Sequence, residues 1–121
     1  MNSTLYRTAW LLAGQWRGEY DPTPYLLTGT TPIRLPSAGP AVYIVGNSAN
    51  EVAYVGSSTS GALGRISAHL REPAKAQHWR SVWVIRLLPH TPEPVVRRIE
   101  GRIGDRLKPV GSRRLPRAWG P

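Results

Sequence analysis

The chain contains no cysteine among its 121 residues. It can therefore form neither a disulfide nor a zinc site built on thiolates. The three histidines, His69, His78 and His90, do not have the spacing of zinc ligands. No apolar run is long enough to cross a bilayer, and the short apolar segment near the N-terminus is too brief for a signal peptide. The sequence therefore predicts an intracellular, cytoplasmic protein with no membrane partner.

Acidic residues are also scarce, with 7 Asp and Glu against 16 Lys and Arg and a formal net charge of +9. Such an excess attracts a polyanion, and nucleic acid is the first candidate. Most of the basic residues are arginines, which form bidentate contacts with phosphate. A merely soluble basic domain is the simpler alternative. The hydrophobic content of 40% argues against wholesale disorder and predicts one ordinary domain with a modest core.

The first 40 residues are predicted to form an arm that packs on the rest of the chain. Residues 3–16 have apolar positions at helical spacing, with Ser3 or Thr4 as the cap. The segment 17–40 is rich in proline, threonine and glycine, so long regular structure is not expected there. The arm has no function that the sequence identifies.

Residues 41–116 are predicted to form the core domain, followed by a tail at 117–121. β-Branched and aromatic runs predict strands, polar turns separate them, and prolines mark helix boundaries. The expected elements are a hairpin of strands 41–45 and 52–55 around a turn at 46–50, a helix over 62–71 stopped by Pro73, a strand over 81–88, and a helix from Thr91 and Pro92 to 107, with Thr91 as its cap.

Polar residues border the apolar faces of the two core helices. Arg65 and His69 are four residues apart and share a stripe beside the apolar arc of the first helix. Glu100 falls at the edge of the apolar arc of the second, whereas Asp105 lies on its far side. The simpler interpretation of Arg65 and His69 is a solvated flank of the helix, and the simpler interpretation of Glu100 is an ion pair with an arginine. The functional alternative for Glu100 is a metal ligand, because hard divalent cations bind carboxylate oxygen.

Two tyrosines lie among the apolar residues of the hairpin strands, Tyr43 in the first and Tyr54 in the second. Packing is the usual role of an aromatic residue in a strand. Together with the helix residues, however, they supply two phenols, one imidazole, one guanidinium and one carboxylate. This set can hydrolyse a phosphodiester: a base or aligned water attacks phosphorus, a cation stabilises the developing charge, and a metal assists the leaving oxygen.

The same residues occur as an ordered set of short motifs over about residues 41–116. They are Val42-Tyr43-Ile44, Tyr54-Val55-Gly56, Arg65 and His69 within "GALGRISAHL", Glu100 within "VVRRIEGRIG", and the tail sequence "GSRRLP". In this order they resemble the GIY-YIG nuclease family. Two positions depart from the family pattern: Val42 replaces the first glycine, and Ser112 occupies the place where the family commonly has asparagine.

The resemblance implies a small α/β (α+β) domain, in which helices flank a three-stranded antiparallel sheet with the site on one sheet face. It implies that Glu100 binds one divalent metal, Mg²⁺ or alternatively Mn²⁺, and that Arg65 holds the scissile phosphate. Tyr54 would position water or phosphate. Tyr43 and His69 are alternatives for the general base or the group that aligns it. An ordinary imidazole titrates nearer neutral pH than a phenol, which favours His69 as the proton acceptor.

The predicted function is metal-dependent endonuclease activity on DNA, with Ser112, Arg113 and Arg114 as further candidates for DNA contact. A GIY-YIG-like module that binds nucleic acid but cuts weakly or not at all is the alternative, favoured by Ser112. A nuclease toxin acting on DNA or RNA is a third. In the arm, Arg7 and Arg17 are candidates for DNA contact together with Arg34, although packing explains them equally well. Target specificity and oligomeric state have no signal in the sequence.

Overall fold

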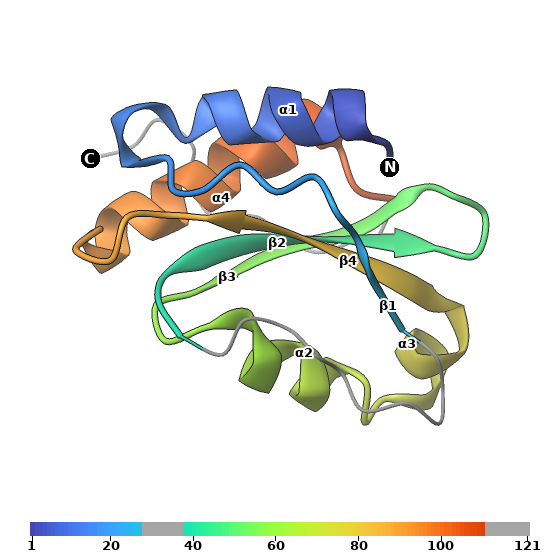
Figure 1. The fold of residues 1–121 in the computed structure, drawn as a ribbon. Helices are drawn as coiled ribbons and strands as arrows, with labels where there is room; N and C mark the ends of the chain where they lie inside the picture. The colour runs from blue at the N-terminus through green and yellow to red at the C-terminus, as the bar shows by residue number, and fades with distance from the viewer. Residues whose placement is uncertain (28–37, 111–121) are drawn as a thin grey trace.

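The computed structural model describes residues 1–27 and 38–110, apart from the side chains of Ala62, Leu63 and Arg65. These residues form a mixed α/β fold in which helices cover both faces of a sheet (Figure 1). The elements in chain order are α1 (Ser3–Leu12), the short 3-10 helix η1 (Gly14–Trp16), β1 (Tyr25–Leu26), β2 (Ala41–Asn47), β3 (Val52–Ser58), α2 (Ala62–His69), α3 (Pro73–His78), β4 (Trp79–Arg86) and α4 (Glu93–Leu107).

The sheet is antiparallel and has four strands in the order β1-β4-β2-β3. The expected hairpin is confirmed as β2 and β3, each longer than its apolar run. The expectation of three strands missed β1, whose two residues come from the proline-rich part of the arm. Tyr25 pairs with Val82 and Leu26 with Ser81, and the Leu27 amide donates to the Arg80 carbonyl at 2.7 Å. This pairing covers part of the β4 edge, where backbone groups would otherwise lack partners.

Side chains alternate between two cores, one on each face of the sheet. Val42 and Ile44 of β2 belong to the core beneath α1 and α4. Ala41, Tyr43 and Val45 belong to the core on the α2 face. Figure 1 shows α1 and α4 above the sheet and α2 below it. In β2, the even-numbered residues Val42 and Ile44 therefore face α1 and α4, and the odd-numbered residues from Ala41 to Val45 face α2.

The expected helices are present, but several of their ends differ. The cap of α1 is Asn2, whose side-chain oxygen accepts from the Leu5 amide at 2.9 Å, and not Ser3 or Thr4. Thr91 does not cap α4; its hydroxyl donates to the Leu88 carbonyl at 2.6 Å. That bond stabilises the preceding turn, and α4 starts two residues later.

An additional short helix, α3, follows Glu72, where the sequence was expected only to stop a helix. Pro73 is compatible with the first position of a helix because its fixed φ is helical and its missing N–H is not needed there. Pro73, which was expected to stop the preceding helix, thus starts α3, whereas α2 ends earlier, at His69. This places the side chains of α3 beside the end of α2 and the start of β4.

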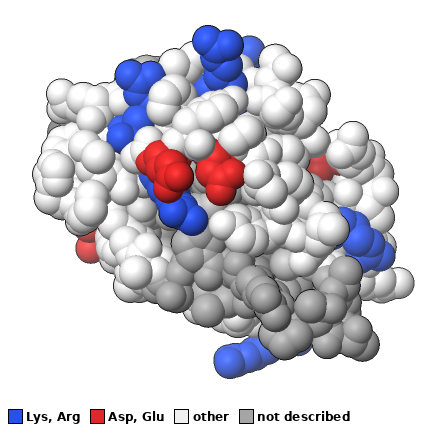
Figure 2. Space-filling model, in the orientation of Figure 1, with Lys and Arg blue, Asp and Glu red and all other residues white. Residues whose placement is uncertain are grey.

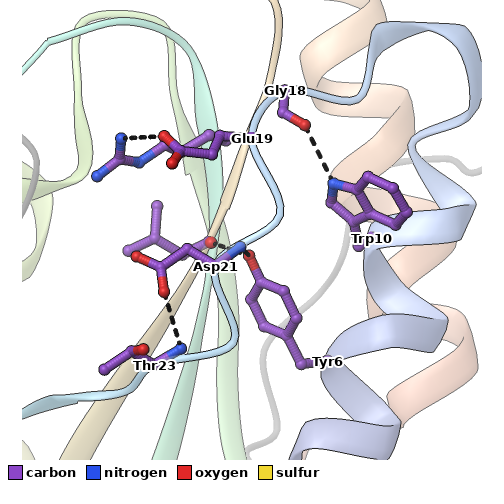
Figure 3. Close-up of polar contacts among 8 residues, drawn as sticks. Tyr6, Trp10, Gly18, Glu19, Asp21 and Thr23 are labelled. Atoms are coloured by element: carbon purple, nitrogen blue, oxygen red, sulfur yellow. Dashed lines mark hydrogen bonds and ion pairs between the residues drawn. The ribbon is translucent and has the colours of Figure 1, made fainter.

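The arm is part of the main core. Tyr6 of α1 is fully buried and stacks edge-on against Tyr20, with ring centroids 5.4 Å apart. Its hydroxyl donates to the Val84 carbonyl of β4 at 2.8 Å and accepts from the Asp21 amide at 3.4 Å (Figure 3). Burial raises the pKa of Tyr6 above the ordinary value for a tyrosine. The arm and the β4 strand are therefore joined by a buried polar contact as well as by apolar packing.

Further polar contacts hold the segment after α1 in place (Figure 3). The Trp10 indole N–H donates to the Gly18 carbonyl at 3.2 Å. Arg86 of β4 pairs with Glu19 at 3.4 Å. Arg17, one of the candidates for DNA contact, donates to the Gly14 carbonyl at 2.8 Å and lies over the Trp10 ring. The second candidate, Arg7, is exposed, and Arg34 lies outside the described residues.

None of the helices in the described part of the chain has the length and apolar character needed to span a bilayer.

Candidate active site

Tyr43 and Tyr54 converge on the α2 face of the sheet. Tyr43 pairs with Gly56 and Tyr54 with Val45, so the two tyrosines are diagonal neighbours on adjacent strands. Their rings are nearly parallel, with centroids 6.1 Å apart and an interplanar angle of 15°. The ring of Tyr43 is 1% exposed, whereas Tyr54 is half-buried. The two tyrosines of the predicted hairpin thus share the α2 face of the sheet.

His69 joins the tyrosines from the end of α2. Its ring centroid lies 4.7 Å from that of Tyr54. Trp79, the first residue of β4, closes the group, with ring centroids 5.3 Å from Tyr54 and 5.4 Å from His69. These four residues, Tyr43, Tyr54, His69 and Trp79, are called the aromatic cluster below. The half-buried rings of Tyr54 and His69 connect the cluster with the surface.

Lys75 of α3 contacts the cluster from one side. Its ammonium nitrogen lies 2.9 Å from Nδ1 of His69 and 3.1 Å from a carboxylate oxygen of Glu72. The same nitrogen lies 5.7 Å from the ring centroids of both Tyr54 and Trp79. This is within the range of cation–π attraction. Lys75 therefore interacts with three members of the aromatic cluster and with one carboxylate.

The other candidates on the α2 side are only partly described. Arg65 belongs to α2, four residues before His69, but its side chain is outside what the structure describes. The tail residues Ser112, Arg113 and Arg114 also lie outside the described residues. Their predicted contacts with phosphate stay predictions.

Glu100 is buried at the interface between α4 and the sheet. It is 2% exposed, and the Ser57 hydroxyl of β3 donates to its Oε1 at 2.6 Å. Ser57 lies two residues after Val55 in β3 and therefore faces the same side of the sheet as Val55, whose side chain belongs to the core beneath α4. Tyr54 points to the opposite face. Glu100 and the aromatic cluster thus contact the edge strand β3 from opposite faces of the sheet. The sequence placed Glu100 at the border of the apolar face, and the structure places it further inside.

Gly56 connects these two groups of residues. An added Cβ at Gly56 would overlap the Tyr43 hydroxyl and the adjacent ring carbon, and would lie 2.6 Å from Cε2. The Tyr43 ring therefore lies directly on the Gly56 backbone, and the next residue, Ser57, holds Glu100. The Tyr43 ring packs against Gly56, and the next residue of the same edge strand, Ser57, is hydrogen-bonded to the Glu100 carboxylate.

A hard divalent cation such as Mg²⁺ binds oxygen donors. Mg²⁺ is usually bound through one or two carboxylates, retains several waters and takes further ligands from substrate phosphate. Glu100 supplies the carboxylate, with the Ser57 hydroxyl beside it. Within residues 1–27 and 38–110, no group of three or more His, Asp or Glu side chains forms a site of higher protein coordination. Glu100 is therefore the residue that would hold such an ion.

Basic side chains do not form one patch on the face seen in Figure 2: they are scattered over it, and one lies beside the two acidic side chains near the middle. Exposed basic residues occur on several elements, and those in the described ranges include Arg7, Arg71, Arg80, Arg97, Arg106 and Lys108. The basic residues of the described ranges are thus distributed, and the aromatic cluster has its own cation in Lys75.

Sequence reasoning missed Lys75, Trp79 and Ser57. The sequence contained a signal for each of the three. Glu72-Pro73 is typical of a helix start and would have placed Lys75 in the first turn of a short helix after His69. Ser57 continues the strand alternation beyond Val55 and therefore faces the α4 side. Trp79 begins an apolar run that was taken to start at Ser81.

No family model, curated protein or solved structure matches the chain.

Proposed function

We propose that this protein is a metal-dependent endonuclease that hydrolyses phosphodiester bonds in DNA. The observation that supports it most directly is the convergence of Tyr43, Tyr54 and His69 on one face of the sheet. Residues from two strands and a helix, up to 26 positions apart in the chain, meet there with proton-carrying groups (43 to 69). Phenol and imidazole groups can accept, donate or orient protons during attack on phosphorus.

In this proposal each member of the site has a separate task. Tyr43, which is buried against Gly56, and His69 handle the proton of the attacking water or align it. Tyr54 is half-buried and positions water or phosphate. Arg65, one turn before His69 in α2, binds the scissile phosphate. Arginine suits this task because its planar guanidinium matches phosphate oxygens bidentately.

Glu100 holds the divalent cation in this proposal, and Ser57 orients its carboxylate through the 2.6 Å hydrogen bond. When bound, Mg²⁺ or Mn²⁺ supplies positive charge that stabilises oxygen leaving from phosphorus. The Ser57 bond fixes one carboxylate oxygen, which limits the orientations that Glu100 can adopt. Nucleic acid as the partner is supported by the net charge of +9.

A second candidate function is a nucleic-acid-binding module that cuts weakly or not at all. It is favoured by the 2% exposure of Glu100, because a carboxylate so enclosed in the α4 interface serves packing and hydrogen bonding as readily as metal binding. The contact of Lys75 with His69 points the same way, because it occupies one of the two ring nitrogens. A nuclease toxin that acts on RNA has the same site chemistry and differs in substrate.

The experiment that tests the proposal is incubation of supercoiled plasmid with the full chain, with Mg²⁺, with Mn²⁺ and with a chelator. Labelled single-stranded and duplex RNA are incubated in parallel, and the ends of any product are sequenced. Metal-dependent conversion of plasmid to nicked or linear DNA is expected. Binding of DNA without cleavage in either metal would instead support the module, and cleavage confined to RNA would support the toxin.

Glu100→Gln is expected to abolish metal-dependent cleavage and to leave DNA affinity within about 2-fold, because each phosphate contact is made by a cation and not by this acid. Asp105→Asn is the matched control, since Asp105 is exposed on the same helix. DNA affinity is measured by fluorescence anisotropy in the chelator. Cleavage by Glu100→Gln at the rate of the Asp105→Asn variant would remove Glu100 from the site.

A further inference from the structure

The contact between Lys75 and His69 fixes more than the position of the imidazole ring. Nζ of Lys75 lies 2.9 Å from Nδ1 of His69, a distance at which one nitrogen must donate and the other must accept. A lysine ammonium has three donors and no acceptor. If Lys75 is the donor, Nδ1 must carry a lone pair and no proton.

Three observations identify Lys75 as the ammonium donor. Glu72 forms an ion pair with it at 3.1 Å. The rings of Tyr54 and Trp79 each lie 5.7 Å from the same nitrogen and attract a cation through their π faces. All three contacts favour positive charge on Lys75. An imidazolium at His69 would place a second cation and a second donor against the first.

We propose that Lys75 is a positioning residue that holds His69 as the neutral tautomer with its proton on Nε2. In this tautomer the lone pair of Nδ1 is occupied by Lys75, and Nε2 is a hydrogen-bond donor. His69 cannot accept a proton in this state, because neither ring nitrogen has an available lone pair. Acceptance would require Lys75 to move away from Nδ1.

The consequence for catalysis rests on the proposed function. His69 donates its Nε2 proton in a hydrogen bond to a phosphate oxygen or to the attacking water, and it aligns the reactants without removing a proton. Tyr43 then remains as the proton acceptor, and it acts as the phenolate: it takes one proton of the attacking water as the water oxygen bonds to phosphorus, and it returns that proton to solvent afterwards. The structure thereby distinguishes two roles that the sequence left as alternatives, and it does so through a residue that sequence reasoning missed.

The ring nitrogens of His69 report the tautomer directly. The full chain is labelled with ¹⁵N, and long-range ¹H–¹⁵N spectra are recorded at about pH 7.5, above the ordinary titration range of histidine. The exposed histidines, His78 and His90, serve as internal references for rings that exchange between tautomers. His69 is expected to show one protonated nitrogen at Nε2 and one unprotonated nitrogen at Nδ1. The wild-type chain alone is enough for this test: a proton on Nδ1 of His69, or ¹⁵N shifts averaged like those of the reference histidines, would overturn the proposal.

Variants of Lys75 test whether the lysine is the cause. Lys75→Met keeps a long side chain and removes the donors, so the single tautomer is expected to be lost. Lys75→Arg restores N–H donors and is expected to restore it. Lys108→Met is the matched control, because Lys108 is the other lysine of the sequence and is exposed at the end of α4. A single Nε2–H tautomer retained in Lys75→Met would refute the role of Lys75.

Cleavage kinetics test the catalytic consequence separately. The amide nitrogen of glutamine can imitate an Nε2–H donor but cannot act as a base. His69→Gln is therefore expected to cut about 10- to 100-fold faster than His69→Ala. Equal loss in both variants would contradict the role of His69 as an Nε2–H donor. A wild-type chain that cuts neither DNA nor RNA would refute the proposed function, and the ¹⁵N spectra would still decide the role of Lys75.

Discussion

Replacement of Gly56 by alanine tests the contact on which the candidate site is built. The added Cβ would meet the end of the Tyr43 ring, and Tyr43 is 1% exposed and stacked against Tyr54. The ring cannot move outward freely, because it is enclosed by the core on the α2 face. Gly56→Ala must therefore displace Tyr43, the strand, or both.

The magnitude follows from two opposing effects. Forcing extra volume into a packed core costs typically about 1–3 kcal/mol. Alanine in place of glycine in a strand regains about 0.5–1 kcal/mol of backbone conformational entropy. The steric term is larger, so Gly56→Ala is expected to lower the free energy of unfolding by about 0.5–2 kcal/mol. Gly64→Ala is the control with the opposite sign. Gly64 is in α2 with no atom within 4 Å of an added Cβ, so a gain of about 0.5–1 kcal/mol is expected there.

Urea unfolding of four proteins forms a double-mutant cycle: wild type, Gly56→Ala, Tyr43→Ala and the double variant. Tyr43→Ala alone is expected to cost about 3–5 kcal/mol, as for other large aromatic truncations. With the ring removed, Gly56→Ala no longer meets an obstacle and should stabilise the chain by about 0.5–1 kcal/mol, so a coupling of about 1–3 kcal/mol should result. Additivity within about 0.5 kcal/mol, or stabilisation by Gly56→Ala in the wild-type background, would refute the close contact.

Two further predictions concern the arm and the tail. Because burial raises the pKa of Tyr6, the folded state favours the neutral phenol; that stability is complete below the ordinary tyrosine range of about pH 10 and is lost as the pH rises through the folded pKa. Tyr6→Phe loses the hydrogen bond to Val84 and is expected to lower the free energy of unfolding by about 1 kcal/mol at neutral pH. Above about pH 10, the unfolding free energy of this variant should decline less steeply than that of the wild-type chain. Parallel declines in the two chains would contradict this reasoning. DNA affinity is expected to fall with salt at a slope of about −0.9 per phosphate contact, and replacing both Arg113 and Arg114 by alanine should flatten the slope by up to about 2. A slope near zero for the intact chain would make its net charge incidental to binding.

The fold was predictable where the pattern was local. The β-branched runs around Tyr43 and Tyr54 predicted the hairpin, and its strands are β2 and β3. The proline-rich segment gave no such signal for β1, because a two-residue strand is stabilised by pairing with β4 and not by its own sequence. The cap of α1 was missed for a similar reason, since Asn2, Ser3 and Thr4 are all good caps and only the structure distinguishes them.

The candidate site was predictable on the α2 face and less so around Glu100. Strand alternation and helical spacing gave Tyr43 and His69, two of the residues that meet Tyr54, because both patterns depend on backbone geometry alone. The burial of Glu100 depends on how α4 lies against β3, which is a tertiary property. Ser57 and Lys75 were missed because a serine after a strand motif and a lysine after a proline are common on protein surfaces. Their contacts form only when two separate elements pack together, β3 with α4 and α2 with α3.

The edge strand β3 contacts both parts of the proposed site, although these two parts lie on opposite faces of the sheet. Tyr54 belongs to the aromatic cluster, Gly56 receives the Tyr43 ring, and Ser57 binds Glu100, all within four consecutive residues. A displacement of this strand would change both faces together. Gly56→Ala should therefore change the ¹⁵N spectrum of His69 less than Lys75→Met does, since it acts on Tyr43, but it should lower cleavage through Tyr43 and Glu100 at once. A site in which the two faces worked independently would lose only the contribution of Tyr43.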